Sequence, residues 1–428
     1  MFNVSILPRR RSPRSGTGPT RGLSSTLILA LGTFAVGTDA FVVAGFLPSM
    51  AAELNVSQAA AGQSITVFAV AYAVLSPVLA TLTARLPRRT LLVGALLVLA
   101  LGNVGSALAP SLPVLIATRV VAAAGAAAYT PAAGAVGAGL VRPELRARAL
   151  SVVIGGLTVA TAMGVPLGSL ASRTFGWRTA LCLVAALSLL AAAGIRLSMP
   201  ALPGAPPQHG GPLRARLAVL RRPAVLTVLP LTVLGMGAAY TAYAYSVPAL
   251  RGAGVPALWV VWMLVLYGMG AVTGNFLVGY GTDRWGPVRV LWIGYAVMAA
   301  SLAGLGLLAA ADVSLVAVAG ALVLLWGGSS WSQTPPQQFR LIAAAPAEAP
   351  VVVSLNSSGI YAGIALGTLL GGAALPAGIP AVYGLGAALA VLALVFLLVT
   401  GRGRARGTAR TPDCRAPDPR RAAGERSR

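Results

Sequence analysis

The amino-acid sequence predicts an all-α integral membrane protein whose twelve transmembrane helices form two six-helix bundles. Three observations lead to this fold class. Hydrophobic residues make up 57% of the 428-residue chain and charged residues only 10%, whereas a soluble domain carries roughly 25% charged residues. Twelve apolar runs are long enough to cross the hydrocarbon core, which takes about 20 helical residues. A short charged loop motif also recurs about half a chain apart, after the second apolar run of each half, which indicates a duplicated six-span unit.

Leu, Ala, Val and Gly carry the predicted spans, and the 51 glycines favour close helix packing in lipid. The first six spans lie near residues 25–50, 64–83, 91–109, 114–140, 150–172 and 179–197. The last six lie near residues 225–250, 258–280, 288–311, 314–331, 352–375 and 379–400. Since the first run exceeds the roughly 7–15 residues of a signal-peptide apolar region, we expect it to remain as a span.

The spans divide the chain into five parts. Residues 23–199 form the predicted N-terminal six-helix bundle and residues 224–400 the C-terminal one. Between them, residues 200–223 are rich in Pro and Gly and form the predicted cytoplasmic linker. Residues 1–22 and 401–428 are rich in Arg, Pro, Gly and Ser, a composition that predicts disordered basic tails.

The formal net charge of +23 raises the question of nucleic-acid binding, and its distribution gives the answer. All 32 basic residues are Arg, and nearly all of them fall in the two tails or in alternate loops. Positively charged loops stay cytoplasmic, so we expect a multi-pass protein of the cell (plasma) membrane with both termini in the cytoplasm. The charge is then a topology signal with some attraction for anionic lipid, and we predict no nucleic-acid partner.

The residues that ordinary catalysis requires are scarce. The single histidine, His209, lies in the linker, so neither a Ser–His–Asp triad nor a histidine-based metal site can form. Cys182 and Cys414 lie in a span and in a tail, which does not suit a structural disulfide. No phosphate-binding G-x-x-x-x-G-K-[ST] loop is present. We therefore predict no enzyme activity, metal or cofactor, and expect energy to come from an ion gradient or the substrate's own gradient.

Two charged residues inside apolar runs are the first functional candidates, because a charge within the membrane is costly. Asp39 lies mid-way along the first span, where a carboxylate must face a wet cavity, pair with a cation or hold its proton. Such a carboxyl group suits proton coupling, and a structural acid bonded to the backbone is the alternative. Arg119 in the fourth span is the natural partner, because Arg stays charged and either pairs with the acid or releases it. Its alternative is to extend toward the outer interface.

The duplicated loop motif is intact in the second half and degraded in the first. The second copy has the form G-x-x-x-D-R-x-G and consists of Gly279, Asp283, Arg284 and Gly286. The first copy keeps Arg85 and Arg88. It has Ala84 where an acid is expected and Pro87 where a glycine is expected. The motif looks like the loop signature of the major facilitator superfamily.

The fifth span adds a further motif. Its Gly164, Pro166 and Gly168 allow tight helix contact and a kink. Together with the Asp39 and Arg119 segments, this motif resembles the drug:H+ antiporter-1 branch of the superfamily. Within that branch the chain is most similar to the chloramphenicol-resistance and arabinose-efflux-permease-like group. The resemblance covers about residues 24–400 and departs from the family's pattern at the first loop copy and at Ala122–Ala123, where Gln-Gly is common.

The resemblance implies a secondary active transporter that exports a small amphiphilic compound or drug in exchange for protons. Two bundles rock around a central cavity, and the motif loops act as a gate on the cytoplasmic side. It also implies a monomer in the lipid bilayer. Cavity walls in this family come mainly from spans 1, 4, 7 and 10, which here offer Asp39, Arg119, Tyr129, Tyr240, Tyr243 and Trp331. For each aromatic residue, plain packing is the alternative.

Two other interpretations stay open, namely a sugar or nucleoside permease of the same fold and a non-transporting membrane sensor. A cavity with one acid and one base is near neutral, and its aromatic walls suit a neutral or weakly charged amphiphile. A sugar would need many convergent polar groups, which these spans lack. We therefore expect a small-molecule substrate of the chloramphenicol type.

Overall fold

The structure is a computed structural model that describes residues 19–83, 85–142, 145–199, 218–345 and 349–401. The chain is helical throughout most of these ranges, and no strand occurs in them. Almost all of both predicted tails, most of the predicted linker and Ala84 lie outside the described residues. The predicted domain limits therefore stay predictions.

The first half folds into six long helices, each long and apolar enough to cross a membrane. They are α1 (Pro19–Glu53), α2 (Gln58–Leu82), α3 (Arg88–Ala107), α4 (Leu112–Gly139), α5 (Arg146–Phe175) and α6 (Trp177–Ser198). Each helix covers one of the predicted apolar runs, so the runs located the six spans of this half.

The second half has four helices of the same kind and two interrupted spans. The four are α11 (Val260–Trp285), α12 (Pro287–Ala311), α15 (Ala349–Ala374) and α16 (Ile379–Gly401). The seventh predicted span contains α8 (Pro223–Leu226), α9 (Leu229–Tyr243) and α10 (Ser246–Gly252), and the tenth contains α13 (Val316–Ser332), followed by α14 (Thr334–Ala344). Two short 3-10 helices, η2 (Ala218–Arg221) and η4 (Leu375–Ala377), complete the described elements.

Prolines account for these interruptions. Pro248 has no N–H to donate to the Ala244 carbonyl one turn earlier, and the chain breaks between α9 and α10 at that point. Pro335 and Pro336 lie in the first turn of α14, which begins at Thr334, two residues after the end of α13. Hydropathy located the seventh span but did not reveal its break, because apolar residues continue across it. The predicted tenth span ends at residue 331, next to the polar residues 332–338 at which α13 ends and α14 begins.

The same helix pairs pack in both halves, as a duplicated unit requires. In the first bundle α1 packs on α5, α2 on α4 and α3 on α6, and in the second α9 packs on α15, α11 on α13 and α12 on α16. Glycine makes the closest of these contacts possible. A Cβ added to Gly45 of α1 would lie 2.5 Å from the Val165 carbonyl oxygen, and one added to Gly367 of α15 would lie 2.3 Å from the Gly237 carbonyl oxygen.

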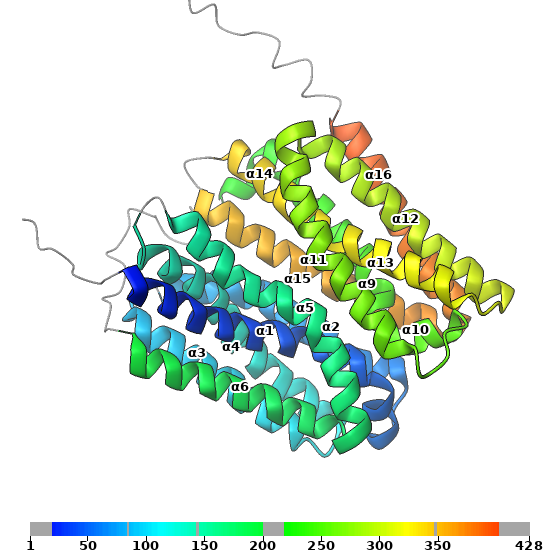
Figure 1. The fold of residues 1–428 in the computed structure, drawn as a ribbon, viewed down its shortest axis with the longest axis horizontal. Coiled ribbons are helices and arrows are strands. Elements are labelled where there is room, and N and C mark those ends of the chain that lie inside the picture. Colours follow the sequence, from blue (N-terminus) through cyan, green and yellow to red (C-terminus); the bar gives the residue numbers. More distant parts are fainter. Residues whose placement is uncertain (1–18, 84, 143–144, 200–217, 346–348, 402–428) are drawn as a thin grey trace, which may run out of the picture.

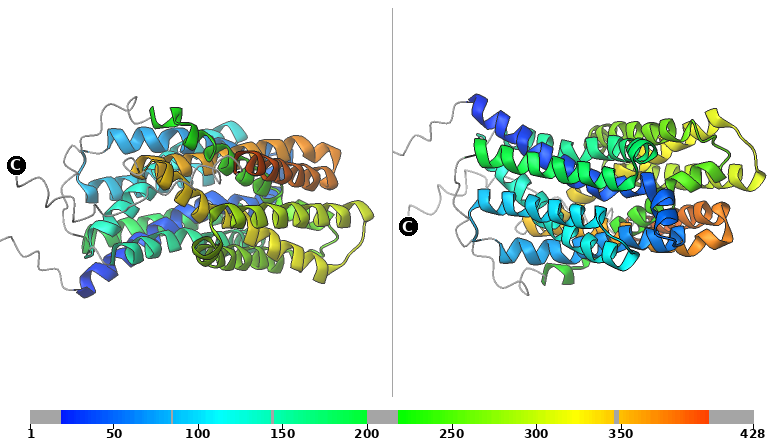
Figure 2. Two further views of the ribbon diagram at one scale, coloured as in Figure 1. Left: turned by 90° about the horizontal axis from the view of Figure 1, so that it is seen from above. Right: turned by 90° about the horizontal axis from the view of Figure 1, so that it is seen from below.

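The two bundles lie side by side, and the start of α1 and the end of α16 are at the same end of the molecule (Figures 1 and 2). The bundles contact each other through α2 against α15 and α5 against α11, with α10 against α1 as a further contact. Tyr245 lies at the break between α9 and α10, at the end of the molecule away from the termini. There its side chain packs between α2 and α15. A Cβ on Gly62 of α2 would lie 2.3 Å from its hydroxyl, and one on Gly372 of α15 would lie 2.5 Å away. This end of the bundle interface is therefore tightly packed.

Candidate functional site

The centre of the first bundle holds a buried ion pair between α1 and α4. Arg119 donates from Nη1 to Asp39 Oδ1 at 2.5 Å and from Nη2 to the Asp39 backbone oxygen at 3.1 Å. The two side chains are 1% and 0% exposed. Arg119 is thus turned inward to the acid and does not extend toward the interface. The sequence placed these residues in facing spans, and the structure brings them into direct contact.

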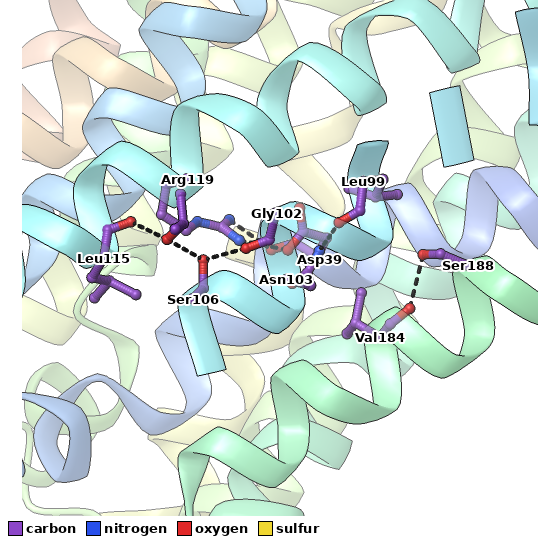
Figure 3. Close-up of polar contacts among 10 residues, drawn as sticks. Asp39, Leu99, Gly102, Asn103, Ser106, Leu115, Arg119, Val184 and Ser188 are labelled. Carbon is purple, nitrogen blue, oxygen red and sulfur yellow. Dashed lines mark hydrogen bonds and ion pairs between the residues drawn. The ribbon is translucent and has the colours of Figure 1, made fainter. Parts of the chain in front are cut away.

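The surroundings of the pair are mostly apolar, with a few oriented polar groups. The Arg119 guanidinium lies 4.4 Å from the centroid of the Phe68 ring, a cation–π contact from α2. Asn103 of α3 lies beside the Asp39 carboxyl, and Ser106 and Thr118 bond to each other at 2.9 Å next to Arg119 (Figure 3). The pair is therefore held by α1, α2, α3 and α4 together.

The small residue at position 122 has a packing reason. Helices α3 and α4 approach so closely that a Cβ on Gly102 would lie 2.4 Å from the Ala122 backbone nitrogen. Ala122 is fully buried in this contact, one turn beyond Arg119 on α4. A long side chain such as Gln would not fit between the helices, so this departure from the family's pattern follows from how α3 and α4 pack.

The fifth-span motif lies against α1 on either side of Asp39. A Cβ on Gly164 would contact Thr38 at 3.4 Å, and one on Gly168 would lie 2.3 Å from the Val42 side chain. Pro166 lies inside α5 between the two glycines. The motif thus brings α5 close to the stretch of α1 that carries the acid.

Aromatic residues gather on the opposite face of α1. Phe41 follows Asp39 by two residues, so its side chain leaves the helix about 200° away. Its ring centroid lies 6.3 Å from that of Tyr240, 6.4 Å from that of Tyr243 and 5.9 Å from that of Trp331. Three of the four aromatic residues predicted for the cavity are therefore together, and a residue of the first bundle lies among them.

Two further aromatic residues extend the group into the second bundle. Tyr267 of α11 lies 4.5 Å from Tyr243 and 4.8 Å from Trp326 of α13, measured between ring centroids. We call Tyr240, Tyr243, Tyr267, Trp326 and Trp331 the aromatic cluster. Four of the rings are buried and that of Trp331 is partly buried, and the rings pack against one another in this conformation.

Tyr129, the fourth predicted cavity residue, lies elsewhere. Its hydroxyl donates to the Leu29 backbone oxygen at 3.0 Å and meets α1 at Gly32, where a Cβ would lie 2.0 Å from the hydroxyl. The side chain is buried between α1 and α4 inside the first bundle. The structure thus does not bring Tyr129 together with the aromatic cluster.

The two loop copies differ in build. In the second copy α11 runs through Asp283 and Arg284, and Gly286, at φ +81°, turns the chain directly into α12. Asp283 is exposed and forms no ion pair within the described part of the chain, while Arg284 donates to the Tyr280 hydroxyl at 3.2 Å. Gly279 faces open space. In the first copy, Arg85 is exposed in a turn and Arg88 begins α3 after Pro87.

The sequence pattern of the Major Facilitator Superfamily matches residues 29–349. The chain belongs to the major facilitator superfamily. It is therefore a multi-pass membrane transporter for a small-molecule substrate and not an enzyme.

Two relatives at about one-third identity are a transport protein and a resistance protein. The inner membrane transport protein YdhP of Escherichia coli (strain K12) is 33% identical over 381 residues, which cover 88% of this chain and 95% of that protein. The chloramphenicol resistance protein of Streptomyces lividans is 33% identical over 345 residues, which cover 80% of this chain and 87% of that protein.

Solved structures of superfamily members share the fold. The D-xylose–proton symporter superimposes with a TM-score of 0.72 at 16% identity, covering 88% of this chain and 97% of that one. A bacterial homologue of the human lysosomal transporter Spinster, inward-facing and occupied, gives 0.69 at 18% identity, covering 90% and 98%. The fold class predicted from the apolar runs and the repeated loop is confirmed.

Sequence reasoning missed several residues of the site. Phe41, Phe68 and Asn103 touch the ion pair or the aromatic cluster, and Tyr267 and Trp326 belong to the cluster itself. Tyr267 and Trp326 could have been chosen as candidates from the sequence, since both are aromatic residues with a polar group inside apolar runs. Phe41 and Phe68 carried none, because a phenylalanine in a span is equally suited to face lipid.

Proposed function

We propose that this transporter exports a small, neutral amphiphilic compound of the chloramphenicol type in exchange for protons. The observation that carries the proposal is the buried Asp39–Arg119 pair. Asp39 is the one fully buried carboxylate among the described residues, and the one basic group in contact with it is Arg119. A lone acid with a permanently charged partner is a minimal proton-binding switch.

The switch works through the loss of one charge. When Asp39 binds a proton, its attraction for Arg119 falls, and the guanidinium keeps its charge in the apolar centre of the bundle. Arg119 must then find another partner or a wetter position, which requires α4 to move relative to α1 and Phe68. A proton bound from one side thus favours a different arrangement of the first bundle.

The movement of α4 is close to a contact between the two bundles. Tyr361 of α15 stacks on Tyr72 of α2 with ring centroids 3.6 Å apart, and Phe68, which covers Arg119, lies 6.4 Å from Tyr361. A shift of Arg119 would therefore reach the contact between the bundles through one side chain, that of Phe68. With the termini cytoplasmic, as the arginine distribution predicts, the end packed by Tyr245 faces outward and this conformation is closed to the outside.

The substrate class follows from the surroundings and from one relative. Three of the residues predicted to line the cavity form an aromatic cluster, the buried acid is already paired, and the chloramphenicol resistance protein of Streptomyces lividans is similar over most of both chains. The likeness to the xylose transporter concerns the fold alone, and the aromatic cluster offers few of the convergent polar groups that a sugar needs. We propose a monomer in the plasma membrane as the working unit.

The proposal can be tested in inside-out membrane vesicles that contain the protein. Radiolabelled chloramphenicol should accumulate when the vesicle lumen is acidified, and a protonophore should abolish the accumulation. No accumulation of chloramphenicol, together with accumulation of xylose or a nucleoside, would support the permease interpretation instead. Flux of none of these compounds would favour the non-transporting sensor.

A second test concerns charge. Cells that express the protein should gain more resistance to chloramphenicol than to a bis-quaternary ammonium compound, because the described spans offer a dication no second buried carboxylate beside Asp39. The opposite ranking, with efflux confirmed directly, would contradict the proposed substrate class.

A further inference from the structure

The contact between α2 and α15 contains a pair of stacked aromatic rings. Tyr72 of α2 and Tyr361 of α15 lie face to face, with ring centroids 3.6 Å apart and ring planes at 20°. The other ring pairs in contact within the described ranges have centroids 4.5–6.4 Å apart. Both side chains of the stack are buried. At 3.6 Å the ring faces are in van der Waals contact, so no water fits between them.

The stack lies at about the same depth in the membrane as Asp39. Counted along their helices, Tyr72, Tyr361 and Asp39 are each 13–14 residues, or about 20 Å, from the end of the molecule away from the termini. Tyr245 packs against Gly62 within about one turn of that same end. The stack is therefore a second and deeper closure of the α2–α15 contact, at the level of the acid.

Tyr361 brings the second bundle close to the ion pair of the first. Its ring centroid lies 6.4 Å from that of Phe68, and the Phe68 centroid lies 4.4 Å from the Arg119 guanidinium. The Tyr361 hydroxyl is also close enough to Asp39 for an electrostatic interaction across the boundary between the bundles. A single side chain of α15 thus contacts the ring that covers Arg119 and approaches the acid itself.

Few groups beside Asp39 can exchange a proton with it. Arg119 of α4 faces the carboxyl, the uncharged Asn103 of α3 lies beside it, and Tyr361 of α15 lies within electrostatic reach (Figure 3). Helices α2 and α15 carry no charged residue, and the charged residues of α3, α5 and α6 lie near the helix ends. No second carboxylate within the described ranges faces Asp39, so its proton has to arrive through water or through a tyrosine hydroxyl.

An acid that couples proton flow to transport must not be open to both sides of the membrane at once. If water reached it from both sides, protons would pass through without substrate and the gradient would run down. Exclusion of water is what prevents such proton leakage at a closed site. Asp39 is fully buried in this conformation. Two ring faces in contact also offer no hydrogen-bonded path along which a proton could move.

We propose that the Tyr72–Tyr361 stack is the barrier that stops protons from passing through Asp39 when the two bundles are in contact at α2 and α15. The barrier is formed by the rings, and the Tyr361 hydroxyl is not needed for it. When α15 separates from α2, the Tyr361 ring leaves with it, and water reaches the ion pair from that side. The proposal rests on the proposed function, because it assumes that Asp39 binds the transported proton.

Proton leakage without substrate tests the barrier. The full-length protein is reconstituted in proteoliposomes that contain a pH-sensitive dye, and a potassium diffusion potential drives protons inward. Tyr361→Ala should raise the leak at least about tenfold, and Tyr72→Ala, which removes the other ring, should do the same. Tyr361→Phe keeps the ring and should leak within about twofold of the wild-type protein. The matched control is Tyr383→Ala, which removes a buried ring of α16 that packs against Trp326 inside the second bundle. Its leak should stay near the wild-type level.

A double variant shows whether the leak passes through the acid. Tyr361→Ala/Asp39→Asn has the same gap between α2 and α15 but cannot bind a proton at position 39, so its leak should return to the wild-type level. A leak that persists in the double variant would be a water path that bypasses Asp39, and it would overturn the proposal. Tight membranes with both alanine variants of the stack would also overturn it. Loss of gradient-driven accumulation of chloramphenicol in Tyr361→Phe, without a leak, would show that the hydroxyl relays the proton and that the ring is no barrier.

Failure of the barrier and failure of the proposed function are distinguishable. The wild-type protein, with its stack intact, tests the function through accumulation of chloramphenicol driven by a pH gradient. Normal accumulation by the wild-type protein, together with no leak in the two alanine variants, overturns the barrier and leaves the function standing. If a pH gradient drives neither chloramphenicol nor another neutral aromatic compound through the wild-type protein, the function falls, and the barrier that assumes it falls too.

Discussion

The pair α1 and α4 in the first bundle and the pair α9 and α13 in the second occupy matching places in the duplicated fold, yet they are built differently. Helices α1 and α4 run unbroken through Asp39 and Arg119, whereas α9 and α13 end early and are each followed by a shorter helix, α10 and α14. A buried charge pair needs a rigid frame, since misplacement leaves an unpaired charge in an apolar centre. Helices α9 and α13 instead carry neutral aromatic residues, which pack against one another and against Phe41 of α1. The difference teaches that duplication kept the helix pairing while the two halves took on different chemistry.

The largest effect is expected from breaking the Asp39–Arg119 ion pair of the first bundle. Arg119→Ala leaves the Asp39 carboxylate buried without its cation, so the free energy of unfolding should fall by about 3–5 kcal/mol. Thermal unfolding of the purified protein measures this loss. Arg196→Ala, at an exposed position on α6, is the control and should change little. Adding Asp39→Asn to Arg119→Ala should restore part of the loss, and equal stability of the Arg119 and Arg196 variants would contradict the structural account of the pair.

The next effect concerns the contact between the bundles. Gly62→Leu places a side chain where the Tyr245 hydroxyl lies, 2.3 Å from the position of a Cβ, so this end of the interface cannot close. In a cysteine-free background, a Ser246→Cys probe should become reactive to a membrane-impermeant maleimide added from outside. Transport should fall about tenfold or more, because alternating access needs both closures.

Gly94→Leu is the matched control, since nothing lies within 4 Å of a Cβ at that position. It should leave both labelling and transport near the wild-type level. A Gly62→Leu protein that stays unreactive at position 246 would show that Tyr245 does not seal this end.

The smallest effect on the fold is expected at the intact loop copy. Asp283→Ala removes an exposed acid without an ion pair among the described residues, so stability should change by less than about 0.5 kcal/mol. If Asp283 stabilises the outward-open state from the cytoplasmic side, the variant shifts toward the inward-open state. Cysteines on the cytoplasmic side of the cavity should then be labelled faster. Asp312→Asn, at an exposed position beyond α12, is the control. Unchanged labelling and transport would reduce the motif to a folding element.

The sequence predicted the fold and the ion pair because both follow from strong local signals. Apolar runs of membrane length report spans whatever their packing, and a charge in such a run has few places to go except to its opposite. The cluster was only partly predicted. Tyr240, Tyr243 and Trp331 came from the expected order of cavity spans, but the rotation of each helix about its axis decides which aromatic rings meet. That rotation put Tyr129 inside the first bundle and brought Phe41 into contact with the cluster.

The breaks in α9 and α13 show a second limit. Pro248, Pro335 and Pro336 were visible in the sequence, but prolines also occur inside continuous helices of this protein, such as Pro48 in α1 and Pro166 in α5. Whether a proline kinks or ends a membrane helix depends on whether neighbouring groups satisfy the freed carbonyl, which packing decides.

The proposed function depends most on one residue, Asp39, which is proposed to couple transport to the proton gradient. The most direct measurement compares Asp39→Asn with the wild-type protein in proteoliposomes, in two assays with chloramphenicol. Asn keeps an acceptor for Arg119 but cannot ionise, so substrate exchange without a pH gradient and the binding affinity should stay within about twofold. Accumulation driven by a pH gradient should fall at least about tenfold. Normal gradient-driven accumulation by Asp39→Asn would contradict the proposed role of Asp39, and an equal loss of exchange without a gradient would show that the residue is needed for transport itself and not for coupling.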